Sequence, residues 1–340
     1  TPMALGHAAD NLAEFLEQNP GANIADIAYT LQIGRKSFAH RRFVVGSSSS
    51  DLVARLRNQK EGGSKALDNR PVIFLFPGEG SLWPGMAKHL YRTENYFRDQ
   101  LDQCSDRINP YLAFDIRRFL CDDELAGVSK TRPGAYTQAA LFAVEYCLAR
   151  LWLSWGVTPS AMFGHGLGEY VAATVAEAMS IEDGARLVVE RAKLIGRQPE
   201  GKQIAVDLSE KHLGALRKSI SSIKIAEPKL SYISCVTGAY VSGQQVKEPA
   251  YWEKQMLSPD RFTQVFATLR DLPGAVFLEV GPGCVLSNLA HQQMGTAEDL
   301  VFLPGMQGAV DREDLLGILG KLWSEGVAVD WNRSHHNQTR

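Results

Sequence analysis

Apolar residues fall along this chain in two patterns, short continuous runs and longer stretches with helical spacing. The run "PVIFLF" (71–76) is apolar almost throughout, as expected for a strand buried on both faces of a parallel sheet. Similar strand-like runs recur later in the chain: "SAMF" (160–163), "LSYISCV" (230–236), "AVFLEVGPG" (275–283) and "DLVFLP" (299–304). The pattern therefore predicts several buried strands spread over the last 270 residues.

Amphipathic stretches separate these runs. The strongest is "TQAALFAVEYCLARLWLSWG" (137–156), and "IEDGARLVVERAKLI" (181–195) begins with two acidic residues, Glu182 and Asp183, that favour a helix N-terminus. Strands that alternate with helices indicate an α/β fold, in which helices cover both faces of a mostly parallel sheet.

The first 70 residues have a different character. Helical spacing is found in "NLAEFLEQN" (11–19) and in "NIADIAYTLQIGR" (23–35), where Asn23 is a good N-cap. "FAHRRFVVG" (38–46) is strand-like, and "SSSSDLVARLRNQ" (47–59) predicts a helix preceded by serine caps. The charged, Gly-rich "KEGGSKALDNR" (60–70) is typical of a linker. This segment predicts a small α/β region before the main sheet.

Composition narrows the function classes. The 340 residues are 45% hydrophobic and 22% charged, with a net charge of −2 and no basic stripe, which argues against nucleic acid as a partner. No run approaches a membrane span, and no signal peptide is visible, so we expect a cytoplasmic protein. Both ends resemble cuts within a longer protein. The five cysteines are scattered, without metal-ligand spacing, and predict reduced thiols and no metal or cofactor: Cys104, Cys121, Cys147, Cys235 and Cys284.

The stretch "GHGLGEY" (164–170) lies between a predicted strand and a predicted helix. Gly-x-Ser-x-Gly at such a junction is the nucleophile elbow of hydrolases and acyl-transfer enzymes, but here Gly166 stands where the serine would be. A second Gly-rich turn, "FPGEGS" (76–81), could supply backbone N–H groups as an oxyanion hole. On spacing alone, an elbow and an ordinary tight turn both remain open.

Several motifs, in order along nearly the whole chain, resemble the acyltransferase domain of modular polyketide synthases together with the linker that follows the ketosynthase. The linker-like part is "IADIAYTLQIGRKSFAHRRFVVGSS" (24–48). The acyltransferase-like motifs are "FLFPGEGSLWPGMAKHLY" (74–91), the region from "TQAAL" to "EYVAA" (137–173), "SYISCVTG" (231–238), "YWEKQM" (251–256), "FLEVGPG" (277–283) and "LWSEGVAVDW" (322–331). The resemblance implies a hydrolase-like α/β core.

The resemblance also implies a chemistry. In that family the elbow serine takes a malonyl-type group from coenzyme A and passes it to the phosphopantetheine thiol of a carrier protein. A histidine activates the serine, and an arginine pairs with the free carboxylate of the acyl group. Carried over to this sequence, the nucleophile position is Gly166, flanked by His165 and Leu167. The arginine corresponds to Arg191, and the oxyanion-turn glutamine is replaced by Glu79.

Other catalytic parts of the family are missing from the sequence. The family's base lies in an "AFHS"-like segment beside its selectivity motif, and neither is present here. His212 is the one histidine between the elbow and Tyr232, and it lies in a charged helical pattern typical of a surface. Only 35 residues separate Gly196 from Tyr232, whereas the family's ferredoxin-like subdomain needs about 60. These losses together favour natural degeneration over a single engineered change.

We therefore expect a catalytically inactive acyltransferase-like domain with a structural or docking role. Its expected partners are the adjacent ketosynthase and other synthase domains, a carrier protein, or an acyltransferase acting in trans. One alternative is an enzyme that uses Ser81 or a cysteine as nucleophile. Another is a non-covalent binder of acyl-CoA or acyl-carrier groups through Arg191, unless that arginine is solvated or paired with an acid such as Glu190. The expected segments are a linker region (1–70), a first core part (71–196), a truncated subdomain (197–231), a second core part (232–325) and the start of a following linker (326–340).

Overall fold

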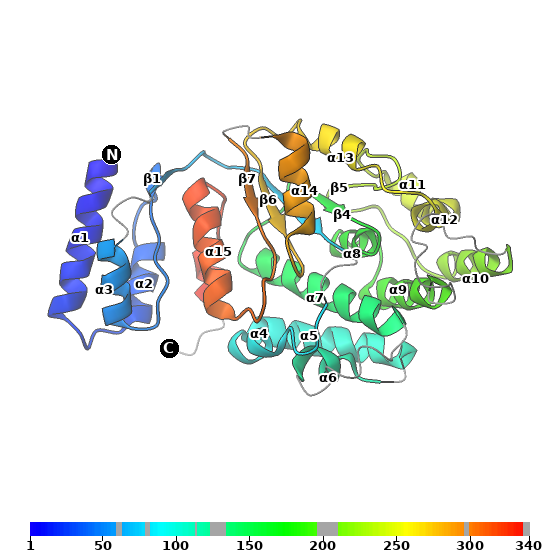
Figure 1. Cartoon of the computed structure of the whole chain (residues 1–340), viewed down its shortest axis with the longest axis horizontal. Helices are drawn as coiled ribbons and strands as arrows, with labels where there is room; N and C mark the ends of the chain where they lie inside the picture. Colours follow the sequence, from blue (N-terminus) through cyan, green and yellow to red (C-terminus); the bar gives the residue numbers. More distant parts are fainter. Residues whose placement is uncertain are drawn as a thin grey trace. The chain divides into compact units, whose positions relative to one another are not determined.

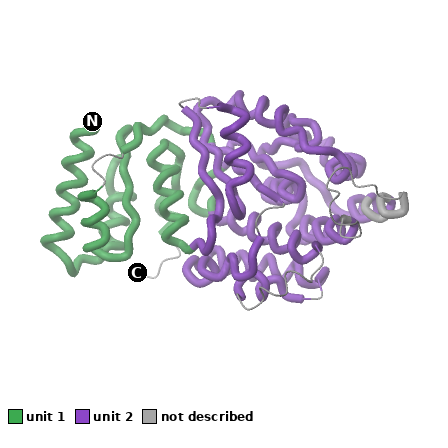
Figure 2. Tube along the Cα trace, viewed as in Figure 1, with its two compact units in different colours: residues 1–71, 152–158, 311–340 green, residues 72–151, 159–310 purple. Residues whose placement is uncertain are grey.

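The structure is a computed structural model that describes residues 1–58, 63–78, 82–112, 114–122, 134–195, 210–295 and 299–335. Contacts within the chain divide it into two compact units (Figure 2). The first unit contains residues 1–71, 152–158 and 311–340, and the second contains residues 72–151 and 159–310.

A five-stranded parallel sheet forms the centre of the second unit (Figure 1). Its strands lie in the order β5-β4-β3-β6-β7, so the first strand of the unit is central and the chain extends the sheet on both sides. The strands are β3 (Val72–Phe76), β4 (Ala161–Gly164), β5 (Tyr232–Ile233), β6 (Val276–Glu279) and β7 (Val301–Leu303). All five residues of β3 are buried, which agrees with its continuous apolar run. The predicted α/β fold is confirmed.

One predicted strand is shorter than expected. "LSYISCV" contributes only the two residues of β5, because the chain turns at Ser234. The Ser234 hydroxyl accepts backbone N–H bonds from Val236 at 3.1 Å and Thr237 at 3.3 Å, which draws these donors away from the sheet.

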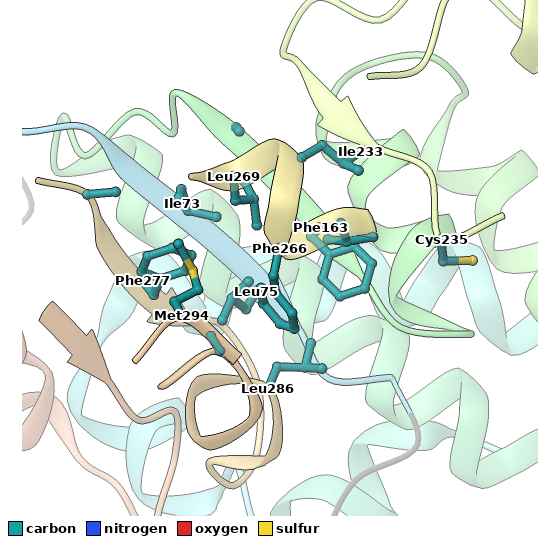
Figure 3. Close-up of a cluster of buried hydrophobic side chains, with 14 residues drawn as sticks. Ile73, Leu75, Phe163, Ile233, Cys235, Phe266, Leu269, Phe277, Leu286 and Met294 are labelled. Carbon is teal, nitrogen blue, oxygen red and sulfur yellow. The ribbon is translucent and has the colours of Figure 1, made fainter. Parts of the chain in front are cut away.

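Helices cover both faces of the sheet. On one face α13 (Phe262–Leu269) and α14 (Val285–Met294) pack against β3, β4 and β6, and Figure 3 shows Phe266 and Leu286 meeting Leu75 there. The other helices of the unit are α4 (Lys88–Thr93), α5 (Asn95–Ile108), α6 (Ile116–Cys121), α7 (Gly134–Ser154), α8 (Gly168–Val175), α9 (Ile181–Ile195), α10 (Glu210–Ser221), α11 (Gly243–Lys247) and α12 (Pro249–Leu257), with a 3-10 turn at Asn109–Tyr111.

The first unit has a small core of its own, with Leu16 and Leu56 at its centre. Its helices are α1 (Pro2–Gln18), α2 (Ile24–Ile33), α3 (Ser49–Asn58), α15 (Arg312–Glu325) and α16 (Trp331–His335). As expected, Asn23 caps α2, since its Oδ1 accepts the Ala25 N–H at 2.9 Å.

Two expectations for this unit need correction. The predicted strand at 38–46 is reduced to β1 (His40–Arg41), and the predicted linker contains its antiparallel partner, β2 (Ser64–Lys65). Pairing stops at these two residues, and the next residue, Arg42, donates from its guanidinium to the Leu56 carbonyl at 2.6 Å. The linker-like composition of 60–70 thus conceals a short structural element.

The segment expected to be a truncated subdomain is only partly described. Residues 210–231 hold one helix, α10, and no strand, while residues 196–209 lie outside the described residues. The side chain of His212 lies outside them too. Within the described part of the chain, no helix is both long and apolar enough to cross a bilayer.

Candidate functional site

The turn between β4 and α8 has the geometry of a strand–turn–helix elbow. It consists of His165, Gly166 and Leu167, and Gly166 has a positive φ of +53°. Among the described residues, a Cβ atom built on Gly166 would have one neighbour within 4 Å, the Nη2 atom of Arg191 at 3.6 Å. There is thus room for a side chain at the apex, although the backbone conformation favours glycine.

The glycines on either side of the apex are in a different situation. A Cβ atom on Gly164 would lie 2.0 Å from the Gly168 carbonyl carbon, and one on Gly168 would lie 2.2 Å from the Phe76 carbonyl oxygen. These contacts are far inside van der Waals distance, so only glycine allows β3, β4 and α8 to approach this closely. The flanking glycines are required for the fold, whereas no described atom would clash with a side chain at the apex.

Arg191 faces this apex from α9. Its side chain is buried, and its Nη1 donates to Gln138 Oε1 on α7 at 2.7 Å. The expectation of a solvated arginine on a helix face is therefore wrong. Pairing with Glu190 is also disfavoured, because adjacent helical positions do not face each other. Burial instead brings the Arg191 guanidinium to the apex of the turn, beside Gly166.

His165 lies close to two oxygen atoms of the protein. Its Nε2 lies 3.1 Å from Asp260 Oδ2, its Nδ1 lies 3.3 Å from the Pro77 carbonyl oxygen, and its ring packs on Phe262. Both ring nitrogens therefore face oxygen atoms of the protein. Asp260 was not predicted as a site residue, since it lies 95 positions further along the chain and no local motif marks it.

A buried polar network supports the turn from behind. Glu169 on α8 accepts the Cys235 N–H at 3.2 Å and the hydroxyl of Tyr251 on α12, and its burial raises its pKa to about 8. From α12, Gln255 Nε2 donates to the Gly166 carbonyl at 2.6 Å. Two residues of α12 thus hold the elbow, and sequence reasoning identified neither of them.

The cysteines offer no activated thiol near this turn. Burial raises the pKa of Cys235 and Cys147 well above the usual thiol value, and it raises the pKa of Cys121 to about 12. Cys104 is also buried, and Cys284 is partly exposed with its sulfur accepting an N–H of Asn288 at 3.2 Å. Because the thiolate is the nucleophile, buried protonated thiols are poor candidates.

The remaining predicted site residues, Glu79 and Ser81, lie outside the described residues. The preceding Gly78 is described, and its N–H donates to Glu145 Oε1 at 3.1 Å. Burial raises the pKa of Glu145 well above its ordinary value. Among the described residues, no three His, Cys, Asp or Glu side chains are grouped so that they could hold a metal ion.

A broad groove lies beside the elbow. It has a volume of about 1120 Å³ and runs between α12, α13 and α14. Tyr251 and Asp260, which contact Glu169 and His165 respectively, form part of its wall. Its size lies at the upper end of small-molecule sites.

Two family models match the chain. The model described as "Acyl transferase domain" matches residues 73–214, and the model described as "CurL-like, PKS C-terminal" matches residues 1–56. The first match includes the elbow and Arg191, and the second covers most of the region expected to be a linker.

Curated relatives and solved structures agree with these matches. One component of the phenolphthiocerol/phthiocerol polyketide synthase of Mycobacterium tuberculosis is 29% identical over 414 aligned positions, which cover 97% of this chain and 27% of that protein. The chain thus spans about a quarter of the length of this relative. The acyltransferase domain of ZmaA is 28% identical with a TM-score of 0.89, covering 100% of this chain and 95% of that one. The acyltransferase domain of SpnD, in complex with 2-(pent-4-yn-1-yl)malonyl, is 27% identical with a TM-score of 0.82, covering 96% and 94%.

Proposed function

Because this chain is a polyketide synthase acyltransferase-type domain, we propose that it is a catalytically inactive one with a structural or docking role in its synthase. The observation that carries the proposal is Gly166 at the apex of an otherwise complete elbow. Glycine has no hydroxyl, so no acyl ester can form at this position. The covalent step of acyl transfer is therefore lost at its usual site.

Among the described residues, no general base is directed at the apex either. His165 is the neighbouring histidine, and its ring nitrogens face Asp260 Oδ2 at 3.1 Å and the Pro77 carbonyl oxygen at 3.3 Å rather than the apex. A general base must lie within hydrogen-bond reach of the proton that it removes. Restoring a serine alone would therefore leave it without activation.

The length of the chain supports a wider loss. The alignment with the mycobacterial synthase runs over 414 positions, more than the 340 residues of this chain, so that relative has residues which this chain lacks. Residues 210–231 form one helix without a strand, where a ferredoxin-like subdomain would need several strands. Both observations agree with a truncated subdomain at 197–231.

The elbow keeps the glycines that folding needs. Gly164 and Gly168 are required by close backbone contacts, whereas the apex accepts glycine as the least strained residue at its positive φ. A non-glycine residue in this conformation costs of order 1–3 kcal/mol, which an enzyme tolerates for its chemistry. Retention of the fold without that strain is the pattern expected of a domain kept for its architecture.

Docking partners follow from the relatives, which are much longer multidomain synthases. We propose that the neighbouring ketosynthase and other synthase domains contact this chain. A carrier protein or an acyltransferase acting in trans is the further partner that a module without its own transfer activity would need.

The inactive assignment is tested by incubating the purified chain with malonyl-CoA and measuring its intact mass, with an active acyltransferase domain as positive control. We expect no added malonyl group on the wild type, and none or only slow hydrolysis with Gly166→Ser. Peptide mapping would identify acylation at Ser81 or a cysteine, which would favour the unusual-nucleophile alternative. Rapid malonyl transfer by Gly166→Ser would contradict the absence of a base.

A second candidate function is non-covalent binding of a malonyl-type group. It is favoured by the buried Arg191 guanidinium, which lies 3.6 Å from the Cβ position of residue 166. The SpnD domain, to which this chain is similar, was solved with a malonyl-type ligand. Calorimetry with malonyl-CoA should detect heat of binding to the wild type, and Arg191→Ala should abolish that heat. The control is Arg186→Ala, which changes a more exposed arginine of the same helix and should retain it. If the wild type gives no heat, non-covalent binding is excluded and the structural or docking role is the function that the test supports.

A further inference from the structure

A second pocket lies at the other end of α8 from the elbow. It has a volume of about 380 Å³ and takes its walls from α7, from the end of α8 and the residues after it, and from residues near β5. The lining residues are Tyr146, Arg150, Thr174, Glu177, Ala178, Met179, Ser180, Ile181, Lys224 and Ala226. Since α8 has eight residues, the pocket lies about 12 Å along its axis from Gly166. It therefore belongs to a different part of the unit from the candidate site.

Arg150 is the central polar group of this pocket. It is half-buried on α7, and its Nε atom is shielded from solvent without a hydrogen-bond partner among the described residues. A buried donor that makes no hydrogen bond is costly to keep, which points to an acceptor that completes it. A guanidinium offers two parallel N–H groups that match the oxygens of a phosphate.

The charge of the pocket is positive. Lys224 lines it as well and, within the described part of the chain, neither Lys224 nor Arg150 forms an ion pair. Glu177 is the one carboxylate on the lining, and it is already paired with Lys229, whose Nζ lies 2.6 Å from its Oε2. Two cations thus share one cavity with a carboxylate that has its own partner.

A hydroxyl adds a further donor. Burial raises the pKa of Tyr146 to about 12, so its phenol remains protonated at neutral pH and can donate to an anion. The other hydroxyls are engaged, because Thr174 donates to the Tyr170 carbonyl and Ser180 donates to Asp183. Tyr146, Arg150 and Lys224 are therefore the donors available to a ligand.

We propose that this pocket binds the phosphate group of a small phosphate monoester between Arg150 and Lys224. Two cations lining one pocket suit a dianion better than a monoanionic carboxylate. The volume of about 380 Å³ exceeds that of a phosphate group alone and leaves room for the organic part of the ester. The site does not depend on the malonyl chemistry of the family.

The test is calorimetric titration of the purified 340-residue chain in a phosphate-free buffer, with glycerol 3-phosphate as the probe and inorganic phosphate and glycerol in parallel. We expect glycerol 3-phosphate to bind with a millimolar or lower Kd, glycerol not to bind, and the affinity to fall as salt is raised. Arg150→Gln and Lys224→Gln should each weaken binding at least tenfold. Lys218→Gln, an exposed lysine of α10 outside the pocket, should leave it unchanged.

Three outcomes would overturn the proposal. The first is no binding of glycerol 3-phosphate to the wild type. The second is binding of glycerol 3-phosphate that Lys224→Gln leaves unchanged. Because Lys224 is exposed, its variant should fold normally and tests the site even if Arg150→Gln folds poorly. The third is binding of inorganic phosphate without binding of the ester, which would exclude a monoester ligand.

Discussion

Glu169 gives this domain a predictable dependence of stability on pH. The side chain is fully buried behind the elbow, where its two oxygens accept from the Cys235 N–H and the Tyr251 hydroxyl. Loss of hydration raises its pKa from 4.5 to about 8, and the nearby Asp260 carboxylate acts in the same direction. The folded chain therefore holds a proton on Glu169 that the unfolded chain releases at neutral pH.

The size and sign of the effect follow from linkage. A pKa of about 8 in the folded state against 4.5 in the unfolded state corresponds to about 5 kcal/mol of unfolding free energy. Because the folded pKa is the higher one, this contribution is fully present below pH 4.5 and is lost as the pH rises to about 8. Between these limits the free energy of unfolding should fall by about 1.4 kcal/mol for each pH unit.

The assay is urea unfolding of the wild type and of Glu169→Gln at several pH values from about 5 to about 9. Glutamine is neutral at every pH and can still accept from Cys235, so its variant should lack this fall and gain stability relative to the wild type as the pH rises. Glu227→Gln, which changes an exposed glutamate of the same unit, should keep the wild-type dependence. A Glu169→Gln variant with the same pH dependence as the wild type would refute the assignment.

Three further predictions concern the fold and the thiols. Gly168→Ala should lower the unfolding free energy by more than about 3 kcal/mol, because its Cβ atom would clash with the backbone of Phe76. Gly166→Ala should lower it by about 1–2 kcal/mol, because of the positive φ alone, and urea unfolding would measure both losses. Equal losses would contradict the difference between the two glycines. Arg70→Ala should cost about 1–3 kcal/mol, because Glu325 loses its 2.7 Å ion pair with Arg70 but keeps its contacts with Lys321 and Ser64, and thermal denaturation would detect a lower midpoint. Under native conditions iodoacetamide should label Cys284 before the buried Cys235, and peptide mass spectrometry showing the reverse order would disprove the burial argument.

Much of the architecture could be predicted from local sequence pattern. The run 71–76 is apolar at nearly every position because β3 is central and buried on both faces. The elbow motif is recognisable because Gly164 and Gly168 are required by close contacts, one within the turn and one with β3. The helix at 23–35 was predicted from its cap and spacing, which are interactions between residues close in sequence. Strand lengths were less predictable, since β5 ends where the Ser234 hydroxyl takes up the backbone N–H groups that follow it.

The surroundings of the apex, by contrast, could be known only from the folded chain. Local pattern is enough to show that residue 166 is a glycine in a strand–turn–helix setting, and so that no ester can form there. Folding then brings Arg191 to within 3.6 Å of its Cβ position, engages His165 with Asp260 and bonds Gln255 to its carbonyl. These partners lie 25 to 95 residues away along the chain. Their positions depend on which helices pack against the sheet, and no local periodicity records that packing.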